Sequence, residues 1–212
     1  MNEHEVKGKL GALIILSGPS GAGKSTVCGH VLPKYPKMGF SISCTTRAPR
    51  GQEVDGVDYH FLDVETFRQK VAKGDFLEWA EVHGNYYGTL VSEVAPRIQA
   101  GEDVILDIDV QGHGKVLESL QRHGDWARAV ISVFIVPPSR AVLEERLRGR
   151  KTDSEEAIVK RLGNAQREMA CWREYDYVIV NSDAQEAARE LEAIIVASHC
   201  RTATQLEEPW HE

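Results

Sequence analysis

The segment GPSGAGKS, residues 18–25, contains residue types that bind phosphate. It fits the pattern G-x-x-x-x-G-K-[ST], in which successive backbone N–H groups surround a phosphate and the lysine reaches the terminal phosphates of a nucleotide. The hydroxyl group after the lysine contacts Mg²⁺ in such loops. The pattern therefore predicts that Lys24 binds phosphates and that Ser25 is a ligand of Mg²⁺. The loop alone leaves open whether the protein hydrolyses a nucleotide, uses it as a switch or transfers its phosphate.

A second group of phosphate-binding residue types follows in the sequence. Arg47 and Arg50 lie three residues apart in TTRAPRGQEVDGVDY, which ends near Tyr59, and GNYYGT adds Tyr86 and Tyr87. An arginine fork fits two phosphate oxygens at once, and a tyrosine hydroxyl can donate to another. Taken alone, such arginines are often only surface charges. In a protein that already binds one phosphate, they predict a second phosphate, which would belong to the acceptor of a transfer.

Two carboxylates close an apolar strand in LDID. Asp107 and Asp109 are two residues apart, so an extended backbone points them to one face. An acid at the end of such a strand organises Mg²⁺ in many phosphate-loop enzymes, directly or through water. We expect Asp107 to have this role, although which aspartate serves the metal stays open. The alternative is that a carboxylate here caps the next helix.

The elements that must position these residues alternate between strands and helices. The apolar run 12–17 predicts a buried strand before the glycine loop, and a helix should run from about Gly23 to a stop before Pro33. Further buried strands are expected at 103–109, 129–136 and 175–181, with helical patterns after them at 111–122, 139–149 and 184–199. This alternation predicts a parallel sheet with helices on both faces.

Two segments depart from that alternation. The first reads as short strands around one helix near 64–73, and it predicts a mixed insertion over the carboxyl ends of the strands, where open parallel sheets bind ligands. The second reads as two charged helices. The expected division is a polar tail at 1–10, a core made of 11–37, 91–138 and 171–200, an insertion at 38–90, a helical pair at 139–170, and a frayed polar tail at 201–212.

Composition limits the classes of partner. The formal net charge of −7 disfavours a broad nucleic-acid footprint. The four cysteines are widely spaced, and neither C-x-x-C nor H-E-x-x-H occurs, so no metal-ligand cluster is indicated. The apolar run ALIIL is too short for a signal peptide or a membrane span. We expect a cytoplasmic protein without nucleic-acid or membrane partners, and its oligomeric state stays open.

The chain resembles a known family. The motifs SGPSGAGKST, TTRAPR, EVDGVDYHF, FLEWAEVHGNYYGT, LDIDVQG, PPS, ERLRGR and VIVN occur in the order and at the spacing of the bacterial guanylate kinases, from about residue 11 to 197. The resemblance implies an α/β phosphate-loop nucleoside monophosphate kinase, with a central parallel sheet flanked by helices, a mixed α+β monophosphate-binding insertion and a helical lid. It also implies reversible, Mg²⁺-dependent transfer of phosphate from ATP to GMP or dGMP, giving ADP and GDP.

The resemblance assigns roles to residues by matching motifs. Glu78 would accept hydrogen bonds from guanine N1–H and the 2-amino group, with hydroxyls on the O6 and N7 side, although by itself it reads as an outward-facing carboxylate. The implied ATP site comprises Gly18, Pro19, Ser20, Gly21, Ala22, Gly23, Lys24, Ser25, Thr26 and Asn181. The implied GMP site comprises Ser43, Arg47, Arg50, Glu53, Tyr59, Glu78, Tyr87, Thr89 and Asp109, and the metal ligands would be Ser25 and Asp107. The implied catalytic residues are Lys24, Arg47, Arg146, Arg150 and Arg161.

The sequence departs from the family pattern at two turns. Lys151 stands where many members have a lid glycine, and RGQE carries its glycine one place earlier than the R-x-G-E turn. We expect these changes to affect lid closing or turn shape without removing a ligand. Two other functional classes compete with this interpretation. One is a domain that has lost catalysis and binds phosphorylated or acidic peptides, and the other is a nucleotide switch. The intact phosphate loop disfavours the first, and the lack of an N-K-x-D motif disfavours the second.

Overall fold

Five parallel strands form the central sheet of this computed structural model, which describes residues 8–122, 124–149 and 154–208. The strand order is β2-β7-β1-β8-β9. The strands are β1 (Leu13–Ser17), β2 (Gly39–Phe40), β7 (Val104–Asp107), β8 (Val130–Val136) and β9 (Tyr177–Val180). Four of them confirm the strands expected from apolar runs, but β9 is an edge strand in which only Ile179 is buried. The fifth, β2, lies inside the segment assigned to the insertion, so the sheet extends two residues into that segment.

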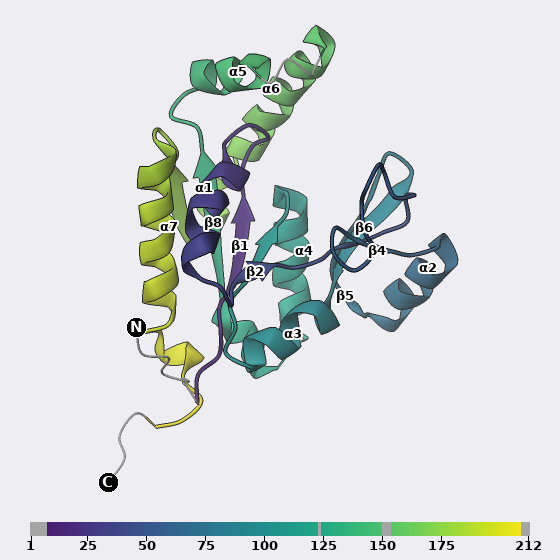
Figure 1. The fold of residues 1–212 in the computed structure, drawn as a ribbon, viewed down its shortest axis with the longest axis vertical. Helices are drawn as coiled ribbons and strands as arrows, with labels where there is room; N and C mark the ends of the chain where they lie inside the picture. The colour runs from purple at the N-terminus through teal and green to yellow at the C-terminus, as the bar shows by residue number, and fades with distance from the viewer. Residues whose placement is uncertain (1–7, 123, 150–153, 209–212) are drawn as a thin grey trace.

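Helices cover both faces of this sheet, as the alternation predicts (Figure 1). On one face, α1 (Lys24–Val31) and α7 (Ala184–Ser198) pack against Ile14 and Leu16 of β1. On the other face, α3 (Val91–Gln99) and α4 (Val110–Leu120) pack against Leu13 and Ile15. Successive side chains of a strand point to opposite faces, so a strand buried on both faces must be apolar throughout.

Helix α3 is absent from the sequence expectations because Pro96 lies inside it. A proline removes one helical hydrogen bond and normally indicates a helix end. Here Val94 and Ile98, on the opposite side of the helix, are completely buried. Pro96 itself is exposed, as is Ser92, whose carbonyl loses its partner and can be hydrated. The burial of the apolar stripe outweighs the local cost.

The insertion forms a second sheet with the order β4-β3-β6-β5, set to one side of the core (Figure 1). Its elements are β3 (Cys44–Thr45), β4 (His60–Phe61), α2 (Val64–Lys73), β5 (Phe76–Val82) and β6 (Asn85–Leu90). Phe67 of α2 stacks between Phe76 and Tyr86, with ring centroids 4.3 and 5.4 Å away. The insertion therefore has its own small core and can hold its strands at a fixed register.

The predicted charged helices are α5 (Arg140–Gly149) and α6 (Glu155–Met169), with α5 following β8 directly along the chain. They project from the carboxyl ends of the strands (Figure 1). Leu143 and Leu147 of α5 pack against Ile158 and Leu162 of α6. This cluster is separate from the two that line the central sheet, so the pair can act as a unit.

The segments expected to be polar tails contact each other, which corrects that prediction for their described residues. Lys9 and Gln205 form an antiparallel bridge, and the Leu10 amide donates to the Thr204 carbonyl at 2.9 Å. Leu10 and Thr204 are 4% and 1% exposed. Polar composition predicts fraying. The contact joins segments that are almost 200 residues apart in the chain, so the local sequence pattern does not reveal it. Across the ranges described, no helix has the length and apolar character needed to cross a membrane.

Candidate active site

The glycine loop joins β1 to α1 at the carboxyl ends of the parallel strands. Two of its glycines have no room for a side chain. A Cβ at Gly18, where φ is +142°, would lie 2.0 Å from the Ile135 carbonyl oxygen. A Cβ at Gly23, where φ is +95°, would lie 2.3 Å from Asn181 Nδ2. Close packing against β8 and β9 therefore fixes the loop in a left-handed conformation that glycine adopts most readily.

Lys24 lies across the loop. Its Nζ donates to the Gly18 carbonyl at 2.9 Å and is 3.7 Å from Asp107 Oδ1. Desolvation raises the pKa of Asp107, while the charge of Lys24 opposes that rise. A cation held over a ring of backbone amides is the arrangement that binds the terminal phosphates of a nucleotide.

The two expected metal ligands suit Mg²⁺ by their chemistry. Ser25 follows Lys24 at the start of α1, and the Asp107 side chain is 41% exposed at the end of β7. A hydroxyl and a carboxylate supply the hard oxygen atoms that Mg²⁺ prefers, and Mg²⁺ usually keeps several waters rather than a full protein cage. The described residues contain no group of three or more histidine, cysteine, aspartate or glutamate side chains that could hold a metal ion.

Asp109 differs from Asp107 in its local role. Its side chain is the N-cap of α4, and Oδ1 accepts from the Gly112 amide at 2.8 Å. The helix-capping alternative therefore applies to Asp109, while Asp107 faces Lys24. The strand therefore does not contain both carboxylates as expected, because β7 ends at Asp107 and Asp109 already begins the turn into α4.

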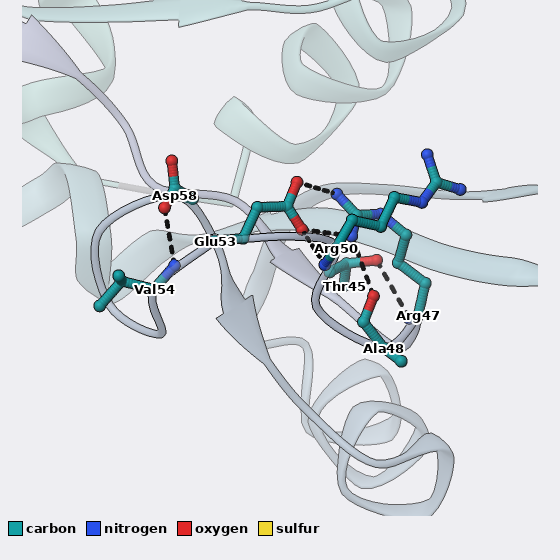
Figure 2. A network of polar contacts seen from close by, with 7 residues as sticks. All are labelled: Thr45, Arg47, Ala48, Arg50, Glu53, Val54 and Asp58. Carbon is teal, nitrogen blue, oxygen red and sulfur yellow. Dashed lines mark hydrogen bonds and ion pairs between the residues drawn. The ribbon is translucent and has the colours of Figure 1, made fainter.

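The loop after β3 orders the cluster of arginines and tyrosines expected at the acceptor phosphate. Glu53 accepts from both terminal nitrogens of Arg47, at 2.6 and 2.7 Å, and from the Arg50 amide at 2.8 Å (Figure 2). The Arg47 guanidinium lies 4.9 Å from the centroid of Tyr59, which is 6.2 Å from that of Tyr87. Hydrogen bonds from Arg47 and from the Arg50 amide lower the pKa of Glu53 to about 2. In contrast, the guanidinium of Arg50 extends away from Glu53 (Figure 2).

Glu78 and Thr89 are opposite each other on β5 and β6. Glu78 is 9% exposed and Thr89 is completely buried. Burial raises the pKa of Glu78, while the nearby hydroxyl and amide of Thr89 and the charge of Lys115 oppose that rise. Within the part of the chain that the structure describes, Thr89 Oγ1 has no hydrogen-bond partner of good geometry. Ser43, just before β3, continues the register that pairs Cys44 with Gly88, so it lies beside this pair.

The lid helices bring arginines to the glycine loop. Arg146 of α5 donates to the Asn181 carbonyl at 2.8 Å and to the Ala22 carbonyl at 3.3 Å. Arg161 of α6 donates to Ser20 Oγ at 3.3 Å. The expected catalytic residue Arg150 and the unusual Lys151 lie outside the described residues.

These features form two groups: a glycine loop that arginines of α5 and α6 contact, and an insertion with a cluster of arginine, tyrosine and glutamate side chains and a buried carboxylate. The model of the guanylate kinase family matches residues 11–198 of the chain. The chain belongs to the guanylate kinase family.

Individual relatives agree with the family match. The guanylate kinase of Aromatoleum aromaticum is 48% identical over 93% of this chain and 93% of its own length. That of Carboxydothermus hydrogenoformans is 46% identical over 88% of each. Among solved structures, the guanylate kinase from Anaplasma phagocytophilum superposes with a TM-score of 0.70 at 35% identity, covering 93% of this chain and 91% of that one.

One residue near the glycine loop, Glu168, was not predicted from the sequence. Glu168 is partly buried on α6, seven residues after Arg161 and therefore on nearly the same helix face. Burial raises the pKa of its carboxyl group. The charge of Lys24 lowers this pKa, and the charge of Asp109 raises it further. The seven-residue spacing from Arg161 was the available signal. Glu168 places a carboxylate of α6 within electrostatic reach of Lys24.

Proposed function

We infer that this chain transfers a phosphoryl group from ATP to GMP, the guanylate kinase reaction. The family match and the full-length relatives support the reaction class. The single observation that best supports guanine as the acceptor base is Glu78, a buried carboxylate paired across two strands of the insertion with the buried hydroxyl residue Thr89. A buried site built for hydrogen bonds rejects a base that leaves its polar groups unpaired.

On the donor side, we propose that Lys24 and the backbone N–H groups of residues 18–26, apart from Pro19, bind the phosphates of ATP. Lys24 is already held by the Gly18 carbonyl, so little side-chain conformational freedom would be lost on binding. Ser25 and Asp107 would hold Mg²⁺, which when bound neutralises charge on the β- and γ-phosphates. Asp107 also keeps Lys24 oriented, since the two side chains are 3.7 Å apart.

On the acceptor side, Arg47, Arg50, Tyr59 and Tyr87 would hold the phosphate of GMP. Glu53 accepts from both terminal nitrogens of Arg47, and the Ala48 carbonyl also accepts from Nη1 at 3.0 Å. These contacts fix one edge of the fork, and N–H groups on its other edge would bind the ligand. The Arg50 guanidinium, directed away from Glu53, would complete the anion site (Figure 2).

We propose that guanine is read by the pair on β5 and β6 and by Ser43 and Asp109. Glu78 would accept from N1–H and the 2-amino group, whereas adenine N1 would place a lone pair against the carboxylate. Thr89 Oγ1, buried opposite Glu78, would contact the O6 and N7 side of the base. dGMP is proposed as a second acceptor, since these contacts involve the base and the phosphate.

Transfer itself would depend on positioning and charge stabilisation, because phosphoryl transfer needs little covalent chemistry from the protein. Arg146 and Arg161 reach the glycine loop from the lid, and we propose that they, with Arg150 and Arg47, stabilise the transferring phosphoryl group. A lid that closes over both substrates would also exclude water, the competing acceptor.

An acceptor comparison tests this proposal. ADP release coupled to NADH oxidation should be fastest with GMP, slower with dGMP and at least about 10²-fold slower with AMP, UMP or CMP. Binding of GMP or of a phosphopeptide without any ADP release would instead indicate a binding domain and would refute the kinase activity. The cytoplasmic location and the absence of nucleic-acid and membrane partners stay predictions.

A further inference from the structure

Asn181 is the residue directly after β9, and its side-chain amide is committed to the glycine loop. Nδ2 donates to the Ala22 carbonyl at 2.7 Å, across 159 positions of sequence. Asn181 is 3% exposed, and its Oδ1 is buried with no hydrogen-bond partner in the described ranges. Both polar atoms of the amide therefore lie inside the protein, one of them bonded to the loop.

The Ala22 carbonyl controls the direction of an amide in the phosphate cradle. A trans peptide is planar, so its C=O and the following N–H point in opposite directions. By holding the Ala22 carbonyl, Asn181 turns the Gly23 N–H the other way, away from β9. Gly23 has a left-handed φ of +95°, and a Cβ added to it would lie only 2.3 Å from Asn181 Nδ2. The Asn181 side chain therefore packs directly against the turn. That turn immediately precedes Lys24 at the start of α1.

The same carbonyl receives a hydrogen bond from the lid. Arg146 Nη1 donates to Ala22 at 3.3 Å while Nη2 donates to the main-chain carbonyl of Asn181 at 2.8 Å. One peptide group of the loop is thus held by an amide from the sheet and a guanidinium from α5. Movement of the lid that releases Arg146 leaves Asn181 as the remaining holder of this peptide.

We propose that Asn181 is a positioning residue that aims the Gly23 amide at the donor phosphates, rather than a reader of the adenine base. This inference rests on the proposed phosphoryl transfer and names a residue that acts through the loop. It predicts that removing the amide impairs all nucleoside triphosphate donors equally, because the phosphates are common to them and the base is not.

The test compares two donors in Asn181→Ala: ATP, and purine riboside triphosphate, which lacks the 6-amino group. We expect kcat to fall about 10²-fold with both donors, the cost of a misplaced reacting group. The KM for GMP should stay within about twofold, and ADP affinity, measured by calorimetry, should fall. Asn181→Asp keeps the side-chain shape but places a carboxylate against the Ala22 carbonyl, so it should lose ADP affinity in the same way. This variant keeps the test available if Asn181→Ala folds poorly.

Ser132→Ala is the matched control. Ser132 is 4% exposed on β8 of the same sheet, and its Oγ bonds to Asp176 at 2.9 Å, away from the glycine loop. This variant should lose stability but keep kcat per folded molecule. A loss confined to ATP, with purine riboside triphosphate used as by the unmodified protein, would overturn the proposal, as would unchanged ADP affinity in Asn181→Asp. If the unmodified protein transferred nothing to GMP, the proposed function would fail, yet ADP affinity would still test the role of Asn181.

Discussion

At the residue scale, the most consequential group is the buried carboxylate of Glu78. Its near-complete burial beside Thr89 is costly unless a ligand supplies hydrogen-bond donors. Replacing it by Gln keeps the shape and exchanges one acceptor for a donor. We expect Glu78→Gln to lower kcat/KM for GMP by about 10²-fold and to raise the relative use of AMP. Glu81→Gln, an exposed position on the same strand, is the control, and equal effects of the two changes would contradict the assignment.

The raised pKa of Glu78 also predicts how GMP affinity depends on pH. Burial favours the protonated form, so the free protein loses this acceptor at a higher pH than an ordinary glutamate does. The KM for GMP should therefore rise as the pH falls toward the raised pKa, and the rise should begin above the usual range for a glutamate. A KM profile measured across acidic pH should become flatter in Glu78→Gln. If the KM profile of that variant is unchanged, the rise in KM at acidic pH is caused by the titration of another group.

Lys24 is the residue for which the structure predicts the largest loss of rate. It bonds to the Gly18 carbonyl and approaches Asp107, and neither partner belongs to the hydrophobic core. Lys24→Ala should therefore stay folded while transfer falls by at least about 10³-fold, since the cation stabilises charge on the transferring group. Lys34→Ala, an exposed surface lysine, should leave kcat unchanged. Steady-state kinetics together with a thermal melt separate loss of rate from loss of fold.

How far residue types and spacing predict this site varies from residue to residue. The glycine loop is recognisable from sequence because the residues that it needs are close together in the chain: two glycines, a lysine and a serine within eight residues. The contact between Glu53 and Arg47 needs the loop to fold back on itself, so the sequence reasoning predicted Glu53 only as a ligand of GMP. Glu168 was missed because its neighbours come from the loop and from α4, far away in sequence.

At the scale of elements, burial on both faces explains which strands could be predicted. β1 and most of β8 are apolar at consecutive positions, a pattern that needs no long-range knowledge. β2 has only two residues and depends on pairing with β7, and α3 depends on the burial of Val94 and Ile98 to continue through Pro96. In both cases tertiary contacts decide the structure, and the local pattern does not contain them.

Two histidines at the ends of elements predict opposite effects of pH on stability. His113 of α4 is fully buried and stacks on Tyr175 at 4.0 Å, and desolvation lowers its pKa. The unfolded chain binds a proton more readily there, so this contribution is complete above about pH 6.5 and is lost as the pH falls below it. His199, which ends α7, bonds to Asp103 at 2.9 Å, and this bond raises its pKa. That contribution is complete below about pH 6.5 and is lost as the pH rises through the raised pKa.

Chemical denaturation at about pH 5.5 and pH 7.5 checks both signs. His113→Phe retains the stacked ring without a titratable nitrogen, so it should lose less stability on acidification than the unmodified protein. His199→Gln should lose less stability as the pH rises. Each protonation difference changes the free energy of unfolding by at most about 1.4 kcal/mol per pH unit. The same change in slope for both variants would show that the two environments have been assigned wrongly.

At the scale of the whole molecule, the insertion and the lid approach the cradle from separate elements. Lys115 of α4 donates to the Trp79 carbonyl of β5 at 2.6 Å and ties the insertion to the core. On the other side, Arg146 and Arg161 connect the lid to the glycine loop. Because the lid and the insertion have clusters of their own, each can move as a unit around these contacts.

This arrangement predicts that closure requires both substrates. A ligand shifts a conformational equilibrium only by its differential affinity for the two states, and one nucleotide alone contacts only one of the two mobile parts. A mimic in which adenosine and guanosine are joined by phosphates bridges the lid, the loop and the insertion, so it should reduce the radius of gyration in solution scattering more than ATP or GMP alone. Arg161→Ala should weaken this compaction and lower kcat far more than it weakens GMP binding, since its contact with phosphate would strengthen on closure. GMP affinity that falls in step with kcat would instead mean that Arg161 contributes to the open, substrate-binding state.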